Sequence, residues 1–145
     1  MNKIKIIGIS ICLCQCHLIF SCERAKESDP IKTQFNQLGM SYVLSPLNYI
    51  EEYKTFQMNV HKEKRKLEDQ RSNELKKKET GYQKRAKKLY TRIAVLNAMD
   101  TASKLIEEYQ SKETDETKKE QIKKNLLNLT CYPEVRSVVN KIFSE

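Results

Sequence analysis

The stretch that decides the fold is residues 82–109, which read YQKRAKKLYTRIAVLNAMDTASKLIEEY. Its first apolar side chains recur at spacings of four, three, four and three: Tyr82, Ala86, Leu89, Ile93 and Leu96. This spacing is that of one face of an α-helix, and the apolar character continues to Tyr109. The sequence therefore predicts a long amphipathic helix whose wide apolar stripe forms the core of the domain.

The composition also favours helices. Charged residues make up 32% of the 145 residues, and beyond residue 21 the only glycines are Gly39 and Gly81. So few turn residues disfavour a β-sandwich, a barrel or a Rossmann unit, because each of these needs many tight turns. We predict an all-α fold, a small bundle of three to five helices behind a cleaved signal peptide and a flexible tether.

Another helix is predicted upstream of residues 82–109, with its start near residue 46. Ser45 can accept a free amide at its start, and Pro46 suits the first helical position. An apolar stripe follows at Ile50, Tyr53, Phe56 (or Gln57) and Val60. Residues 61–79 then contain 13 charged side chains among 19. This density of charge predicts a solvent-exposed helix with ion pairs such as that of Glu74 with Lys78. A coiled-coil arm is the alternative, although Glu74 interrupts its seam. Gly81 is expected to mark the next turn or a break.

Shorter elements complete the bundle. A capping box at Thr117 and Glu120 predicts a helix start, and Tyr132-Pro133 interrupts that helix. A final short helix is indicated by four apolar positions at helical spacing: Val135, Val138, Val139 and Ile142. Apolar spacing over residues 31–42 suggests one more short helix within an otherwise polar segment.

The N-terminus has the form of a secretion signal. Two lysines and no acid lie in residues 1–5, and a largely apolar run follows over residues 6–20. That run is roughly 22 Å long as a helix, which is shorter than the ~30 Å hydrocarbon core. Cys22 follows the small residue Ser21, as lipid modification of a cysteine requires, whereas Cys12, Cys14 and Cys16 follow larger residues.

We therefore predict three segments: a lipoprotein signal peptide over residues 1–21, a lipidated N-terminus and tether over residues 22–45, possibly with a short helix, and a helical domain over residues 46–145. An uncleaved anchor, ordinary secretion and a buried core helix are the alternatives for the apolar run. The signal and the Lys-, Ile- and Asn-rich body resemble those of small, plasmid-encoded surface lipoproteins of Borrelia-type spirochaetes. The resemblance implies acyl chains such as palmitate on Cys22, an outer-membrane or cell-surface location, and a capacity to bind host proteins. It assigns no binding residue.

No catalytic motif is apparent in the mature chain. His61 stands beside Lys62 and Lys64 without a defined acidic partner, so we predict a solvent-exposed side chain and not a general base. Cys131 is interpreted as a small apolar residue near a helix end, with an intermolecular disulfide or a reactive thiol as alternatives. Neither a glycine-rich phosphate loop nor zinc-ligand spacing is present. We predict a protein that is not an enzyme and that needs no cofactor or metal.

Basic runs are the remaining candidate site. A polyanion-binding face is predicted from eleven side chains: Lys62, Lys64, Arg65, Lys66, Lys76, Lys77, Lys78, Lys84, Arg85, Lys87 and Lys88. A solubilising helix surface is the alternative, because acids are interspersed among these residues.

The expected partners are the membrane, through acyl chains on Cys22, and a host protein or anionic glycan. Nucleic acid is disfavoured, since an exported protein rarely meets it. The expected function is that of a surface-exposed binding lipoprotein; the alternative is a periplasm-facing structural or regulatory lipoprotein, plasmid- or phage-associated.

Overall fold

The computed structural model describes residues 29–143, which form five α-helices and one short 3-10 helix. The elements are α1 (Pro30–Leu44), α2 (Pro46–Lys77), α3 (Tyr82–Gln110), α4 (Glu116–Asn128), η1 (Leu129–Cys131) and α5 (Pro133–Phe143). No strand occurs within this range. The predicted all-α bundle of three to five helices is confirmed. The predicted signal peptide and Cys22 lie outside the described residues.

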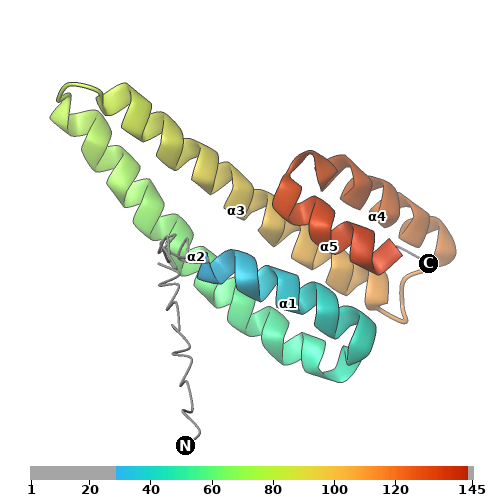
Figure 1. Cartoon of the computed structure of the whole chain (residues 1–145). Helices are drawn as coiled ribbons and strands as arrows, with labels where there is room; N and C mark the ends of the chain where they lie inside the picture. The colour runs from blue at the N-terminus through green and yellow to red at the C-terminus, as the bar shows by residue number, and fades with distance from the viewer. Residues whose placement is uncertain (1–28, 144–145) are drawn as a thin grey trace, which may run out of the picture.

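Helices α2 and α3 form a long antiparallel hairpin, and the other helices cluster at one end of it (Figure 1). Helix α1 packs on α2 and α5, and α4 packs on α3. The connected ends of α2 and α3 project away from this cluster (Figure 1). We call residues 61–92 the arm, and residues 29–60 and 93–143 the body.

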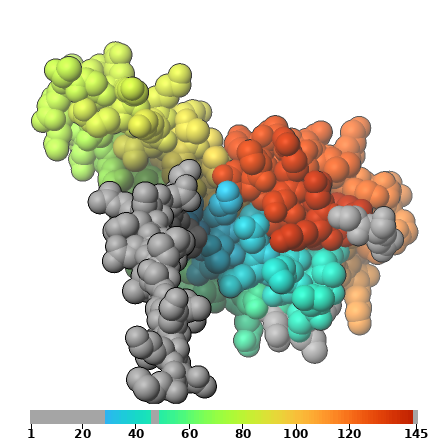
Figure 2. All heavy atoms as spheres, viewed as in Figure 1, coloured from blue at the N-terminus to red at the C-terminus, as the bar shows by residue number. Residues whose placement is uncertain are grey.

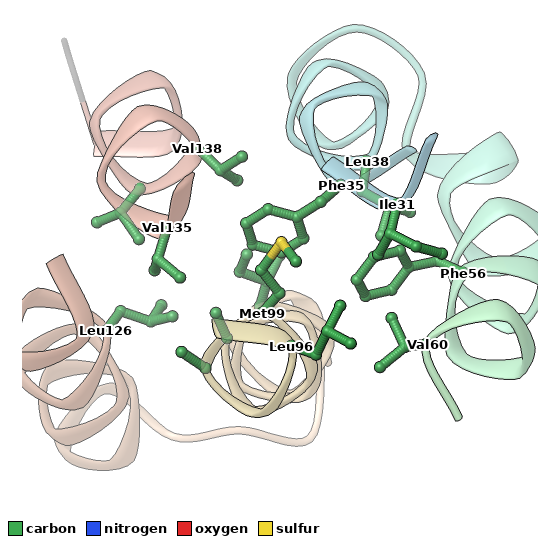
Figure 3. Packing of buried hydrophobic residues seen from close by; sticks show 14 of the residues in the cluster. Ile31, Phe35, Leu38, Phe56, Val60, Leu96, Met99, Leu126, Val135 and Val138 are labelled. Atoms are coloured by element: carbon green, nitrogen blue, oxygen red, sulfur yellow. The ribbon is translucent and has the colours of Figure 1, made fainter. Parts of the chain in front are cut away.

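The body contains the main apolar core (Figure 3). All of its helices contribute side chains with at most 2% of their surface exposed, among them Phe35, Leu38, Phe56, Val60, Leu96, Met99, Leu126, Val135 and Val138. The rings of Phe35 and Phe56 lie 5.5 Å apart, centroid to centroid. Each such side chain stabilises the fold by about 1.5–3 kcal/mol through burial, so the body carries most of the stability.

Helix α1 belongs to the body. The Asp29 carboxylate accepts a hydrogen bond from the backbone N–H of Ile31 (3.1 Å) and caps the helix. A Cβ at Gly39 would lie 2.8 Å from Cγ1 of Val138, so a glycine at this position allows α1 and α5 to approach closely. The packed helical part of the chain thus begins at Pro30, upstream of the boundary at residue 46 that the sequence suggested. Residues 30–44 are helix within the core.

Two local predictions were wrong at the start of α2. Ile50 is 52% exposed, and Tyr49 is the buried residue, with 1% exposed. The Tyr49 hydroxyl donates to the backbone oxygen of Ser103 (3.2 Å), and its ring stacks on Tyr53. The rest of the predicted stripe is confirmed, because Phe56 and Val60 are buried and Tyr53 packs partly buried against the core. The Ser45 side chain makes no capping hydrogen bond within the described residues; its backbone N–H donates to Ser41 instead.

Of the two helix starts predicted near the C-terminus, one is wrong and one is confirmed. The capping box at Thr117 is wrong, because α4 begins at Glu116 and its cap is Asp115, whose carboxylate accepts from the N–H of Lys118 (2.8 Å). The break at Tyr132-Pro133 is confirmed, since α5 begins at Pro133. The predicted apolar face of α5 is confirmed by three fully buried valines: Val135, Val138 and Val139.

Candidate binding surface

The arm turns back on itself through two left-handed backbone positions. Lys78 ends α2 with φ 51°, and Gly81 precedes α3 with φ 78°. The predicted break at Gly81 is therefore confirmed. The predicted ion pair of Glu74 with Lys78 is wrong: Lys78 leaves the helix, and Glu74 accepts a hydrogen bond from Nε of Arg85 (2.6 Å) across the hairpin. Arg85 also donates to the backbone oxygen of Thr80 (2.9 Å) and so closes the turn.

The arm has a thin core. Leu67 and Ala86 are its buried apolar residues, with 7% and 6% exposed. Leu89 packs partly buried, and the Arg71 guanidinium lies 5.4 Å from the centre of the Tyr90 ring. The solvated-helix prediction is confirmed for most side chains of residues 61–77, which are exposed, although α3 packs along this part of α2. Glu74 is accommodated in that interface by its ion pair with Arg85.

Charge is distributed unequally between arm and body. The arm carries 13 basic and 5 acidic side chains, for a formal net charge of +8. The body carries 10 basic and 11 acidic side chains, for a net charge of −1. Figure 2 shows the arm standing clear of the body on this side of the molecule. Because the arm projects, most of its positive charge is presented to solvent; Arg92, at its base, pairs with Asp29 of the body.

The predicted basic residues form two clusters. The tip of the arm gathers Lys76, Lys77, Lys78, Lys84, Arg85, Lys87 and Lys88 around the turn. The second cluster lies toward the body and consists of Lys62, Lys64, Arg65 and Lys66. Ten residues of helix separate Lys66 from Lys76, a rise of about 15 Å. The structure thus joins residues from both sides of Gly81 at the tip and keeps the second cluster apart.

Two open grooves lie along one side of α2, one near the tip of the arm and one where the arm joins the body. The groove near the tip is lined by Gln70, Asn73, Glu74, Lys77, Arg85, Lys88 and Leu89. The groove near the body is lined by Asp29, Pro30, Ile31, Gln34, Asn59, Lys62, Glu63 and Lys66. The α2 residues of both grooves recur every three or four positions from Asn59 to Lys77, so they share one side of that helix. We call this side of the arm the groove face.

Acids on the groove face are each paired with a base. Glu63 pairs with Lys66 (3.8 Å), Glu74 with Arg85 (2.6 Å), and Asp29 with Arg92. Lys62, Lys77 and Lys88 form no ion pair with another described residue. These three lysines therefore give the groove face its uncompensated positive charge. Lys64, Arg65, Lys76, Lys78, Lys84 and Lys87 line neither groove.

An open pocket of about 700 Å³ lies at the opposite end of the body, among Tyr42, Ile50, Glu107, Tyr109 and Lys119. Beside it, burial raises the pKa of the Tyr49 hydroxyl, and nearby Tyr53 and Glu107 raise it further. Burial and the Glu107 carboxylate likewise raise the pKa of Tyr53. These hydroxyls keep their protons at neutral pH, so they act as hydrogen-bond donors rather than bases. The sequence reasoning missed this tyrosine cluster, because its partners on α3 lie some 50 residues away.

The other reactive side chains are isolated. His61 is exposed, as predicted. Cys131 is the last residue of η1, near a helix end as predicted, and its side chain is exposed. Among residues 29–143, no three His, Cys, Asp or Glu side chains are placed to hold a metal ion. In the same range, no helix is long and apolar enough to cross a membrane.

Comparison with known proteins does not place the chain. No protein-family model, no curated protein and no solved structure matches it. The binding surface therefore has to be interpreted from the residues themselves.

Proposed function

We propose that this chain is a membrane-anchored bacterial lipoprotein that binds a negatively charged partner through its arm, without catalysis. The partner is a host ligand or an envelope component on the outer side of a membrane. The observation that carries the proposal is the separation of charge, with +8 on the arm and −1 on the body. A surface that served solubility alone would not need to concentrate its charge on one projection.

The anchor is proposed from the sequence around Cys22. A diacylglyceryl thioether on this residue, with a third chain on its amine, would exceed the two hydrophobic signals that stable membrane attachment requires. The anchor would hold the helical domain at the membrane surface.

The arm is suited to long-range attraction. Charges on a projection are separated from the body, and their field steers polyanions at distances comparable with the Debye length of about 8 Å in physiological salt. Exposed lysines that form no ion pair with another described residue, such as Lys62, Lys77 and Lys88, can pair with sulfate, phosphate or carboxylate groups of a ligand.

Metabolic labelling with palmitate tests the anchor. The wild-type chain, Cys22→Ala and Cys131→Ala should be compared; the last is a matched control that removes the only other cysteine of the mature chain. We expect label and membrane partition in the wild type and in Cys131→Ala, and neither in Cys22→Ala. Label retained in Cys22→Ala would refute the anchor.

Protease treatment of intact cells then tests exposure. The surface-exposed protein should be cut before the cells are lysed. A chain that is acylated but cut only after lysis would support the alternative, a periplasm-facing structural or regulatory lipoprotein.

A further inference from the structure

We infer that the groove face of the arm binds the anionic head groups of the membrane that holds Cys22. The inference rests on the proposed lipid anchor and names the partner of the basic arm. The chemistry recognised is the lipid phosphate, which lysine ammonium groups pair with as point charges. The membrane would then hold the protein twice, through the acyl chains and through the arm.

The reach of the chain brings the groove face to the membrane. Seven residues separate Cys22 from Asp29, which allows a span of at most about 25 Å in any conformation. Asp29 itself lines the groove near the body, next to Lys62 and Lys66. The chain from the anchor therefore arrives on the groove face and not on the far end of the body.

The length of the groove face is similar to the maximal span of the chain between Cys22 and Asp29. Fifteen residues of helix separate Lys62 from Lys77, a rise of about 22 Å. Lys77 and Lys88 line the groove at the tip. Both ends of the face can thus approach head groups while the chain to Cys22 stays within its span.

Electrostatics sets the orientation. The potential of an anionic membrane falls off within about one Debye length, so a charged face is held only when its side chains come close to the head groups. The groove face meets this condition because its acids are paired, Lys62, Lys77 and Lys88 form no ion pair with another described residue, and the chain from Cys22 arrives on this side at Asp29. The body has a net charge of −1, so apart from the residues that line the groove near the arm it is not attracted to the membrane surface.

The short link to the anchor favours lipid over a free polyanion. Anchoring turns the contact with head groups into an intramolecular one, with an effective concentration set by the length of the link. A soluble sulfated glycan would have to compete with this local supply of phosphate. We therefore expect lipid phosphate, and not a soluble glycan, to occupy the groove face.

The test uses the mature chain, residues 22–145, with Cys22→Ala, so that the arm is measured without acyl chains. This chain keeps every described contact. Its sedimentation with vesicles of phosphatidylglycerol and phosphatidylcholine in equal parts is compared with sedimentation with phosphatidylcholine alone. Two triple variants change the net charge equally: Lys62→Glu, Lys77→Glu and Lys88→Glu on the groove face, and Lys54→Glu, Lys112→Glu and Lys124→Glu on the body. The three body lysines are exposed and form no ion pair with another described residue.

We expect binding to the anionic vesicles only, a loss of roughly tenfold or more in the groove-face variant, and little change in the body variant. Both variants should keep the helical circular dichroism of the parent. An equal loss in the two variants would overturn the inference, since net charge alone would then explain the binding. Binding to a sulfated glycan without binding to anionic vesicles would overturn it as well.

The anchor and the face fail separately. A chain that carries palmitate on Cys22 in cells but whose mature form ignores anionic vesicles would refute the groove-face contact alone. A chain that binds the vesicles but is never acylated would refute the anchor, and with it the claim that one membrane is held twice.

Discussion

The arm and the body are built on opposite balances of packing and charge. Five helices meet in the body over fully buried side chains such as Phe35, Leu96 and Val138, and its charges nearly cancel. The arm has two helices, buries Leu67 and Ala86, and carries a net charge of +8. Concentrated like charge destabilises a compact structure through self-repulsion. The stability of the well-packed body therefore compensates for the repulsion between like charges in the thinly packed arm.

The largest expected effect is in the body. Phe35→Ala removes a fully buried ring that packs on Phe56, and should lower the free energy of unfolding by about 3–5 kcal/mol in urea titrations. Met40→Ala, on the same helix but 50% exposed, is the matched control and should change the free energy by about 0.5 kcal/mol or less. Equal, small effects of the two substitutions would show that α1 is a loosely attached segment and not part of the body.

The corresponding truncation in the arm should cost less. Leu67→Ala removes the main apolar contact between α2 and α3 within the arm, and we expect a loss of about 2 kcal/mol because two helices can relax around the gap. Leu75→Ala, which is 41% exposed in the same helix, serves as the control. A cost for Leu67→Ala as large as that for Phe35→Ala would break the distinction between arm and body.

A smaller effect is expected at the turn of the arm. Gly81 has φ 78°, where an L side chain is disfavoured, so Gly81→Ala should cost about 1–2 kcal/mol. Gly81→Asn should cost less, since asparagine tolerates this conformation. Thermal unfolding of the three chains checks the order. Equal stability of the alanine variant and the wild type would mean that the turn does not need its left-handed backbone.

The smallest effect concerns pH and belongs to the body. Burial raises the pKa of Tyr49 above its ordinary value, so the folded chain keeps that proton after the unfolded chain has lost it. Stability should therefore fall as the pH rises above about 10. Tyr49→Phe removes the hydrogen bond to Ser103 and costs about 0.5–1.5 kcal/mol at neutral pH.

The same variant should lose less stability than the wild type between neutral and alkaline pH, as followed by urea titration at each pH. Parallel pH profiles of the two chains would contradict the assignment of this loss to Tyr49.

Local patterns predicted much of this fold. The stripe of α3, the break at Gly81 and the start of α5 at Pro133 follow from spacing and backbone restriction, which are properties of neighbouring residues. The charged character of residues 61–79 was equally visible. The basic residues of the arm could be named for the same reason, because composition does not depend on partners.

What failed depended on partners far along the chain. Gly39 looks unfavourable in a helix, and only its contact with Val138 explains it. Tyr49 and Ile50 both suit a helix start, and a hydrogen bond to Ser103 decides which one is buried. The sequence also could not tell that Lys77 and Lys88 share a groove while Lys76 and Lys87 do not, since the pairing of α2 with α3 decides this.

Hydrogen exchange of the mature chain, measured with and without anionic vesicles, is the best test of the claim that the body supplies stability and the arm binds the membrane. In the free protein, backbone amides between residues 68 and 88 should exchange faster than those around Phe35, Leu96 and Val138, because stability is lowest where packing is thin. Vesicles should then slow exchange in the arm and leave the body unchanged. Uniform exchange along the chain, or protection of the body and not the arm, would contradict the account.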